Sequence, residues 1–309
     1  MIYTCTLNPS IDYIMHVEEF QLGELNRAHK AMYYPGGKGI NVSRVMKRLG
    51  VSTTALGFIG EFTGQFITDF LDKETISHRF VNTKDYTRIN VKLKGDKESE
   101  INGPGPNVSE DQLSSLFQQI KSLQPEDIFI LAGSVPSSLP KDFYSQIADI
   151  CASKNVPLVA DTSGDALKQL IGKPVYFLKP NDHELGELFN TEIETKEQAA
   201  CYASKLVEKG TEHVVVSMGG KGAVYVSKEE QLFATVPHGK VKNSVGAGDS
   251  VVSGFIAAVS QGQSVNEAFR SGVATGSATA FQDDLCHKED ADLLKDQIEI
   301  SPISIKEGL

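Results

Sequence analysis

The sequence contains no tryptophan and only four cysteines among its 309 residues. Cys5, Cys151, Cys201 and Cys286 lie far apart, without a CxxC pair and without the cysteine and histidine spacing of a zinc site. Disulfide frameworks and structural zinc sites are therefore not expected. Reduced thiols of this kind are typical of a cytoplasmic protein.

Positive charge is also scarce. Lys and Arg number 30 against 40 Asp and Glu, which gives a net charge of −10 at pH 7 and a pI near 5.2. Nucleic-acid binding needs concentrated Lys and Arg to neutralise phosphates, and no basic run is present. The composition thus argues against a nucleic-acid partner. An anionic small substrate stays possible, because a few local cations suffice to bind it.

Long apolar runs are missing as well. No stretch approaches the roughly 20 apolar residues that span a bilayer. The N-terminus, MIYTCTLNPSID, has no basic region followed by a long apolar segment. We therefore expect a cytoplasmic protein without a membrane partner. A hydrophobic content of 40% and 12 prolines suit a packed globular protein.

Short β-rich runs recur along the chain, several of them apolar throughout: IYTCTL, TTALGFI, DIFILAG, PLVAD, VYFLKP and HVVVSM. Uniformly apolar strands are typical of sheets that are covered on both faces. Helical patterns lie between them, such as residues 40–49, which carry apolar side chains at helical spacing before Gly50. Strands that alternate with helices predict βαβ units, and hence an α/β domain with a doubly wound, mostly parallel sheet over residues 1–309.

Two segments break this alternation of strands and helices. Residues 10–36, which contain DYIMHVEEF, and residues 86–102, YTRINVKLKGDKESEIN, alternate polar with apolar side chains. Antiparallel strands with one buried face have this pattern. We predict that the two segments form a small antiparallel β lid attached to the main sheet.

The first motif that could carry chemistry is PGGKGINVSRVMKRLG, residues 35–50. Gly36 and Gly37 let backbone N–H groups approach a ligand closely, while Lys38 adds a cation and Asn41 a hydrogen-bonding amide. The motif lacks the Walker A spacing and is not a P-loop. A glycine turn with Asn41 as a helix cap is the competing interpretation.

Single polar residues near the predicted lid and strand ends are further candidates. Asp12 follows a strand end, where open α/β folds bind ligand hydroxyls, although a solvated turn residue is an equally good interpretation. Arg27, Arg88 and Lys92 could clamp an anion from the lid, but exposed charges on strands usually serve only solvation. Ser134, which follows DIFILAG, is similarly open.

KPNDHEL, residues 179–185, follows a predicted strand. Asn181 and Glu184 are three residues apart and could jointly approach a hydrated Mg²⁺, which uses few protein oxygens. The same spacing is a capping box, with Asn181 as the cap and Glu184 reaching back to it. His183 has no second histidine at ligand spacing and is expected to be an ordinary surface residue.

VVVSMGGKGAVYV, residues 214–226, reads as a strand, a glycine turn and a second strand. Ser217, Gly219 and Gly222 could allow a nucleotide to lie against the backbone. A hairpin turn explains the glycines almost as well.

SVGAGDS, residues 244–250, precedes the apolar run VVSGFIAAV. Residues 245–248 would leave several unpaired N–H groups at the start of a helix, where the helix dipole favours a phosphate whose charge grows. Asp249, in the first turn, could accept a hydroxyl proton during phosphoryl transfer. A helix start with an acidic first turn is the alternative. A dinucleotide fingerprint fits less well, because GAGDSV lacks the final glycine.

The order GGKGINVS, NDHE, GAGDS resembles the PfkB, or ribokinase-like, carbohydrate kinase family. The resemblance runs from end to end and includes both glycine signatures of the family, at residues 36–60 and 243–256. It implies a doubly wound α/β domain, a β lid that often forms a homodimer interface, and phosphorylation of a sugar hydroxyl by ATP with Mg²⁺.

The resemblance also implies roles for residues at matching positions. Asp249 would be the catalytic base, with Gly246, Ala247 and Gly248 as the anion hole. The sugar would be bound by Asp12, Arg27, Gly36, Gly37, Lys38, Asn41, Arg88, Asn90 and Ser134. ATP would contact Lys179, Asn181, Ser217, Gly219, Gly222, Gly246 and Gly248. Asn181 and Glu184 would position Mg²⁺ through water.

Within the family, TLNPSID, GELNR, TRINVKL and the GGKG form with Lys38 look most like the branch that phosphorylates fructose 1-phosphate. A branch that acts on tagatose 6-phosphate is a close relative. Lys38, Arg27 and Arg88 favour an acceptor that already carries phosphate, because such a sugar needs counter-charge. The segment SSLP, which follows GSVP, departs from relatives that often have a glycine directly after this proline. This difference leaves the placement of the substrate open.

Two other functional classes also remain open from the sequence. A non-catalytic protein that binds nucleotide or sugar phosphate could retain the same fold, although the set Asp249, Glu184 and Asn181 speaks against it. A dinucleotide oxidoreductase is the third possibility.

Overall fold

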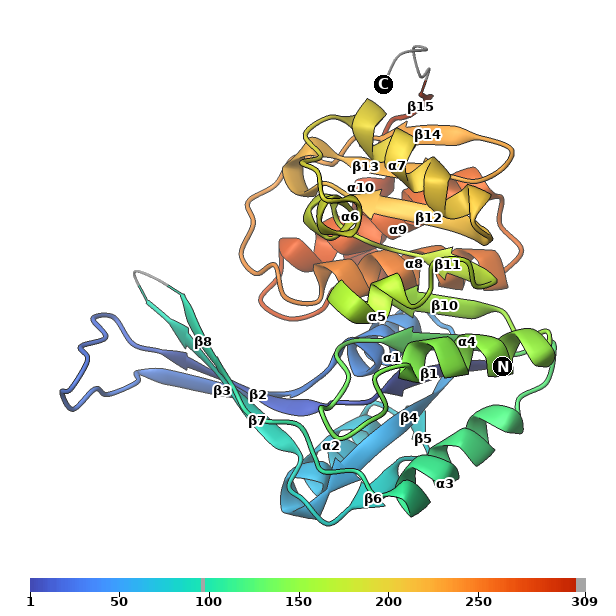
Figure 1. Ribbon diagram of the computed structural model, residues 1–309. Coiled ribbons are helices and arrows are strands. Elements are labelled where there is room, and N and C mark those ends of the chain that lie inside the picture. The colour runs from blue at the N-terminus through green and yellow to red at the C-terminus, as the bar shows by residue number, and fades with distance from the viewer. Residues whose placement is uncertain (96–97, 304–309) are drawn as a thin grey trace.

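The computed structural model describes residues 1–95 and 98–303 (Figure 1). Residues 96–97 of the predicted lid and residues 304–309 of the predicted domain lie outside this part. The strands are β1 (Ile2–Thr6), β2 (Ser10–His16), β3 (Lys30–Gly36), β4 (Thr53–Gly60), β5 (Ser77–His78), β6 (Val81–Thr83), β7 (Arg88–Lys94), β8 (Ser99–Asn102), β9 (Ile128–Ala132), β10 (Leu158–Asp161), β11 (Val175–Leu178), β12 (Thr211–Ser217), β13 (Ala223–Val226), β14 (Gln231–Ala234) and β15 (Ile300–Pro302).

The helices alternate with the strands over most of the chain. They are α1 (Lys38–Arg48), α2 (Glu61–Lys73), α3 (Glu110–Lys121), α4 (Phe143–Ser153), α5 (Gly164–Lys168), α6 (Asp182–Phe189), α7 (Lys196–Glu208), α8 (Ala247–Ser260), α9 (Val265–Ala280) and α10 (Lys288–Lys295), with one 3₁₀ turn, η1 (Gly219–Lys221).

All six predicted strands lie in the main sheet. They are adjacent in the order β12-β11-β10-β9-β1-β4, and each neighbouring pair is parallel. Short strands β5 and β6 continue the parallel pairing at β4. Strands β13, β14 and β15 extend the other edge in antiparallel fashion, beginning with the predicted hairpin between β12 and β13. The mostly parallel, doubly wound sheet is confirmed.

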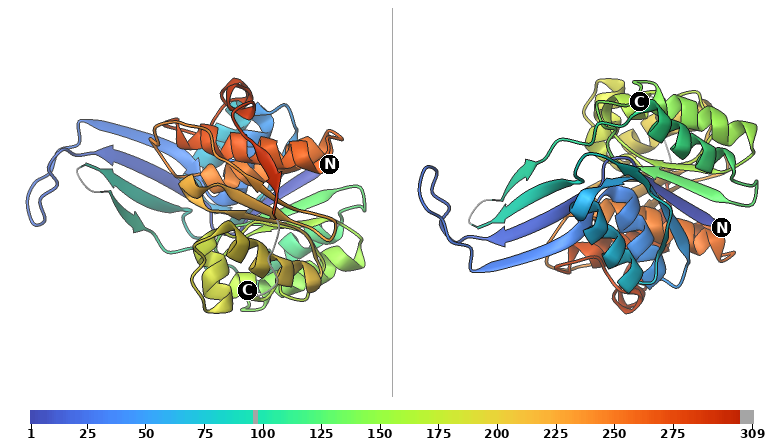
Figure 2. Two further views of the ribbon diagram at one scale, coloured as in Figure 1. Left: turned by 90° about the horizontal axis from the view of Figure 1, so that it is seen from above. Right: turned by 90° about the horizontal axis from the view of Figure 1, so that it is seen from below.

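Helices cover both faces of this sheet, which is why its strands are apolar throughout. Every residue of β4 and β10 is buried. One face packs against α3, α4, α6 and α7, and the other against α1, α8 and α9. Figure 2 shows the blue and orange helices on one side of the sheet and the green and yellow helices on the other. The residues that precede these helices therefore gather at the carboxyl-terminal edge of the parallel strands.

The lid is a separate sheet of four strands in the order β3-β2-β7-β8, and it projects away from the helices (Figure 1). Pairs β2–β3 and β7–β8 are antiparallel, as the alternating pattern predicts, whereas the central pair β2–β7 is parallel. The reason is the connection: the chain leaves the lid after β3, forms α1, β4 and α2, and returns as β7, so no hairpin dictates the direction.

An ionic cluster fixes α1 to the rest of the body. The guanidinium of Arg44 is almost fully buried and pairs with Glu74 at 3.1 Å and with Asp284 at 2.8 Å. Arg48, one turn later, pairs with the same two carboxylates and also donates to the backbone oxygen of Leu285. Because each of the two guanidinium groups pairs with both carboxylates, the cluster holds together α1, the end of α2 and the loop after α9.

Over the described residues, no helix combines the length and the apolar composition that crossing a membrane requires. The four cysteines are free thiols, and only Cys201 is not buried.

Candidate active site

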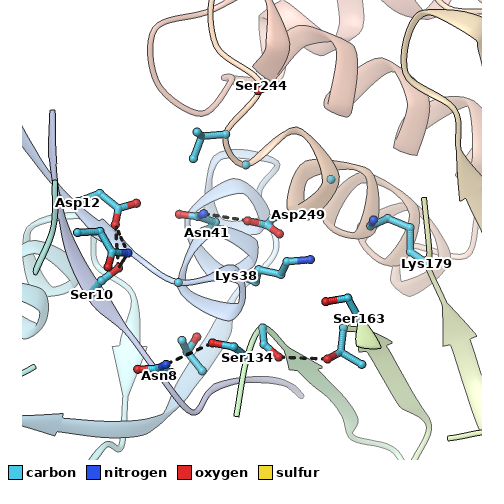
Figure 3. Close-up of a pocket in the computed structure, with 18 of the residues that line it drawn as sticks. Asn8, Ser10, Asp12, Lys38, Asn41, Ser134, Ser163, Lys179, Ser244 and Asp249 are labelled. Atoms are coloured by element: carbon cyan, nitrogen blue, oxygen red, sulfur yellow. Dashed lines mark hydrogen bonds between the residues drawn. The ribbon is translucent and has the colours of Figure 1, made fainter. Parts of the chain in front are cut away.

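A cavity of about 510 Å³ opens at the carboxyl ends of the parallel strands, beside the lid. Its place follows from the topology. The chain proceeds from β1 to β4 on one side and later returns to β9 on the other, so the loops after β1 and β9 diverge there. Asn8 and Ser134, on these two loops, bridge the gap with a hydrogen bond of 3.2 Å (Figure 3).

Most of the predicted site residues line this one cavity, although they are spread over some 240 positions of sequence. They are Asp12, Gly37, Lys38, Asn41, Arg88, Asn90, Ser134, Lys179, Asn181, Glu184, Ser217, Gly246, Gly248 and Asp249.

The other predicted residues do not line it. Arg27 lies on the exposed loop between β2 and β3. Gly36 is buried at the end of lid strand β3, where a Cβ atom would come within 2.5 Å of Asp12 Oδ1. Ala247, Gly219 and Gly222 line an adjoining apolar cavity instead.

Asp249 occupies the first turn of α8 and is 4% exposed. Its Oδ2 accepts a hydrogen bond of 2.8 Å from Asn41 Nδ2 on α1 (Figure 3). Burial raises the pKa of the Asp249 carboxyl from 3.8 to about 6, against the lowering effect of Lys38 and the Asn41 bond. The group is therefore mostly ionised at neutral pH and still basic enough to take a proton.

The glycines before Asp249 make room for their neighbours. Gly246 is the N-cap of α8 with φ of 79°, and a Cβ atom there would lie 2.5 Å from Leu285 Cδ2. Gly248 has an ordinary φ, but a Cβ atom on it would lie 3.2 Å from Lys179 Nζ. The helix start is thus open to an anion while a lysine ammonium reaches its edge.

Asn181 and Glu184 form the predicted capping box at the start of α6. Asn181 Oδ1 accepts from the Glu184 N–H at 2.7 Å, and Glu184 Oε2 accepts from the Asn181 N–H at 2.9 Å. Both residues also line the cavity, so the two interpretations of the motif are compatible. His183 is exposed, as expected for a surface residue.

Polar groups at the base of the lid form a network on the opposite side of the cavity. Asn90 Nδ2 donates to Ser10 Oγ and Asp12 Oδ1, at 3.0 and 3.1 Å, and Ser10 Oγ donates to Asp12 Oδ1 at 2.8 Å. Arg88 donates to the backbone oxygens of Asn8 and Gly103. Desolvation lowers the pKa of the half-buried Arg88, and no carboxylate lies within 4 Å of its nitrogens over the described residues.

The adjoining apolar cavity, of about 340 Å³, shares Ser217, Ser244 and Gly248 with the first one. Sequence analysis missed most of its lining, because separate apolar side chains on loops and helices carry no motif. Its apolar side chains include Val236, Val241, Val251, Val273, Ala280 and Phe281.

Sequence analysis also missed polar residues at the end of β1 and in the segments after β1 and β10. Thr6, Asn8, Ser10, Thr162 and Ser163 line the polar cavity, and the fully buried Asp161 lies behind it. The rule applied to Asp12, that polar residues after a parallel strand approach the ligand, would have found the DTS that ends PLVADTS.

Comparison with known proteins agrees with this arrangement. Residues 5–291 match the family described as pfkB family carbohydrate kinase. The chain is 52% identical to a 1-phosphofructokinase of Bacillus subtilis over 301 residues, which is 97% of this chain and 99% of that protein. It is 36% identical to a D-tagatose-1-phosphate kinase of Bacillus licheniformis, with 97% and 99% covered. The crystal structure of phosphofructokinase-2 from Escherichia coli with substrates and products superimposes with a TM-score of 0.92 at 30% identity, covering 96% of this chain and 98% of that one.

Proposed function

Because the chain belongs to the pfkB family of carbohydrate kinases, we propose that it transfers the γ-phosphate of ATP to the C6 hydroxyl of fructose 1-phosphate. The products are fructose 1,6-bisphosphate and ADP. The observation that carries this proposal is the position of Asp249, a buried carboxylate that lines the polar cavity at the start of α8, where the preceding residues Ala247 and Gly248 border the apolar cavity.

Asp249 acts as the base. Its carboxylate takes the proton of the C6 hydroxyl as that oxygen attacks the γ-phosphorus, and the bond from the γ-phosphorus to the bridging oxygen breaks, leaving its electron pair on ADP. The N–H groups of residues 246–248 and the dipole of α8 stabilise the charge of the phosphoryl group during transfer. Asn41 keeps the carboxylate oriented through its 2.8 Å hydrogen bond.

The two cavities divide the substrates between them. Adenine is an apolar, flat group and fits the apolar cavity, with the phosphates passing Ser217, Ser244 and Gly248 into the polar one. The sugar hydroxyls bind to Asp12 and Asn90. The phosphate already on the sugar pairs with Arg88, whose hydrogen bonds over the described residues go only to backbone oxygens, so its charge stays available.

Mg²⁺ is the metal this family implies, and Asn181 and Glu184 are the residues that would hold it. One oxygen of each is committed to the capping box, which leaves Glu184 Oε1. No group of three His, Cys, Asp or Glu side chains that could bind a metal occurs among the described residues. The pair therefore suits a hydrated Mg²⁺ approached through water. Bound with ATP, the ion neutralises phosphate charge.

A coupled assay of ADP release tests the proposed acceptor. Fructose 1-phosphate, fructose 6-phosphate, tagatose 6-phosphate and tagatose 1-phosphate are compared at low concentration, with the Asp249→Asn variant as the control for contaminating kinases. Tagatose 1-phosphate is included because one relative is named for it. We expect fructose 1-phosphate to give the highest kcat/KM. A higher value with another acceptor would contradict the proposal, and ATP binding without turnover on any of them would favour a regulator.

The lid offers a surface for a second copy of the chain. Its exposed hydrophobic side chains include Leu22, Leu25, Tyr33, Ile89 and Ile101. Such a patch favours association. We expect a homodimer by sedimentation equilibrium, which Ile101→Glu weakens and Leu293→Glu, at a more exposed apolar site on α10, does not. Arg27 lies on the same loop as Leu25, so a second copy or a movement of the lid is needed to bring it to a sugar phosphate.

A further inference from the structure

Asp161, at the end of β10, is a fully buried carboxylate for which the mechanism above has no role. Its Oδ1 lies 3.0 Å from Lys38 Nζ and 3.4 Å from Lys179 Nζ. Its Oδ2 has no hydrogen-bond partner over the described residues. One oxygen atom therefore contacts two ammonium groups, and these are its only polar partners there.

The backbone around Asp161 is held on both sides. Asp161 is paired with Ala132 of β9, and its backbone oxygen accepts a 3.0 Å hydrogen bond from the Gly133 N–H. On the other side, the Lys179 N–H donates to the backbone oxygen of Ala160. The carboxylate thus projects from a part of the sheet that cannot shift without breaking its strand pairing.

The two lysines come from different elements and lie on different sides of the site. Lys38 is the first residue of α1, and its Cβ packs near Gly133 on the loop that bears Ser134. Lys179 follows β11, and its Nζ borders Gly248 at the start of α8. Figure 3 shows the two side chains approaching each other across the cavity. Lys38 is therefore on the side of the sugar, and Lys179 is on the side of the nucleotide.

Two ammonium groups this close repel each other unless a negative charge lies between them. Burial opposes the ionised form of Asp161, yet the two lysines outweigh it and hold the pKa of this carboxyl below its ordinary value. Since Asp161 does not line the cavity, the remaining N–H donors of both lysines are free to meet the substrates there.

We propose that Asp161 is a positioning residue that holds Lys38 and Lys179 on either side of the path of the transferring phosphoryl group. The inference rests on the proposed kinase activity, but not on the identity of the sugar. The two cations neutralise charge that is greatest while the phosphoryl group is between donor and acceptor. Their placement consequently affects kcat more than the binding of either substrate.

Asp161→Asn tests this role by separating kcat from KM, measured with the best acceptor of the wild type. We expect kcat to fall about 30-fold or more, with each KM changed less than about threefold. The matched control is Asp127→Asn, another buried carboxylate, which binds the N-terminal ammonium and the Gln124 N–H far from the cavity. Its kcat should stay within about twofold of the wild type.

Double variants show whether Asp161 acts through the lysines. Adding Asp161→Asn to Lys38→Met or to Lys179→Met should reduce kcat less than the product of the separate effects, because one of the two lysines that Asp161 positions is already gone. Fully multiplicative effects would overturn the proposal. So would a kcat near the wild-type value, or a kcat that is restored by higher Mg²⁺, which would assign Asp161 to the metal.

Thermal unfolding gives a readout that does not depend on the acceptor. Asp161→Asn should lower Tm at pH 7, because Lys179 is 4% exposed and loses its counter-charge, and Lys179→Met added to it should raise Tm again. A Tm that the second substitution lowers further would show that Asp161 does not pair with Lys179. Failure of the wild type with every acceptor would instead reject the proposed kinase activity, while this unfolding test would still decide the pairing.

Discussion

Replacing Asp249 with Asn should remove activity and at the same time stabilise the fold at neutral pH. The carboxyl has a pKa of about 6 in the folded protein, against 3.8 as its ordinary value, and it is buried. A difference of about two pKa units corresponds to about 3 kcal/mol of folding free energy. Asparagine has the shape of the protonated acid and can still accept the Asn41 hydrogen bond, so it should avoid this cost.

The gain in folding stability from Asp249→Asn should increase as pH rises. Between about pH 4 and pH 6 the folded carboxyl keeps a proton that the unfolded one has released, so the wild type loses stability as pH rises through this window. The Asn variant has no such proton. Its advantage should be about 3 kcal/mol at pH 7, roughly half of that at pH 5, and roughly a fifth of it at pH 4.

Urea unfolding of the wild type and the variant at pH 4, 5 and 7 measures this difference, and the coupled ADP-release assay measures turnover. We expect kcat of Asp249→Asn to be lower by a factor of about 10² or more, because the base is gone. Asp127→Asn serves as the control and should give no such gain. Equal stabilities at pH 7, or a gain that does not shrink toward pH 4, would refute the reasoning from burial, and wild-type turnover would remove Asp249 from its role.

Three further predictions concern the same cavity. Gly248→Ala should raise helix stability by up to about 1 kcal/mol, because alanine is the better helix former, yet it should lower kcat, because a Cβ atom would come within 3.2 Å of the Lys179 ammonium and displace it. Urea unfolding and steady-state kinetics on one preparation measure both effects. A loss of both stability and kcat would contradict the prediction. In the wild type, kcat/KM should fall below about pH 6 as Asp249 takes up a proton. Lys38→Met should move this acidic limb of the pH profile to higher pH, because Lys38 lowers the pKa of Asp249. A shift to lower pH would be inconsistent with that charge effect. Arg88→Ala should raise KM for the sugar phosphate by about 10-fold or more while leaving KM for ATP nearly unchanged, and an equal rise in both would remove Arg88 from the sugar side.

The sequence predicted the parts of the site whose chemistry is local. The starts of α1, α6 and α8 each depend on a few adjacent residues, so GGKGIN, NDHE and GAGDS could be placed on helix starts without knowing the fold. The strands were also predictable, because burial on both faces leaves uniformly apolar runs such as TTALGFI. Their meeting in one cavity follows from parallel pairing, since it brings all carboxyl ends to one edge.

Other features depend on distant partners and could not be read from single segments. Asp161 ends PLVAD like any strand residue, and its two lysines stand 123 positions before it and 18 positions after it. The apolar cavity consists of ordinary core residues such as Val251 and Phe281. Alternation within β2 and β7 predicts which face is buried, but not that these strands run parallel. Arg27 has the positive charge that a sugar phosphate needs, yet it lies on the exposed loop between β2 and β3, away from the cavity.

The ionic cluster of Arg44 and Arg48 has a mechanical consequence. Helix α1 contributes Lys38 and Asn41 to the cavity, and through Arg44 and Asp284 it also fastens the loop whose Leu285 packs against Gly246. The residues that bind the acceptor and the helix start that binds the transferring phosphate are thereby attached to the same helix, α1. They therefore keep their positions relative to each other. The movement that admits the sugar and releases the product must therefore come from the lid, which projects away from the main sheet and its helices (Figure 1).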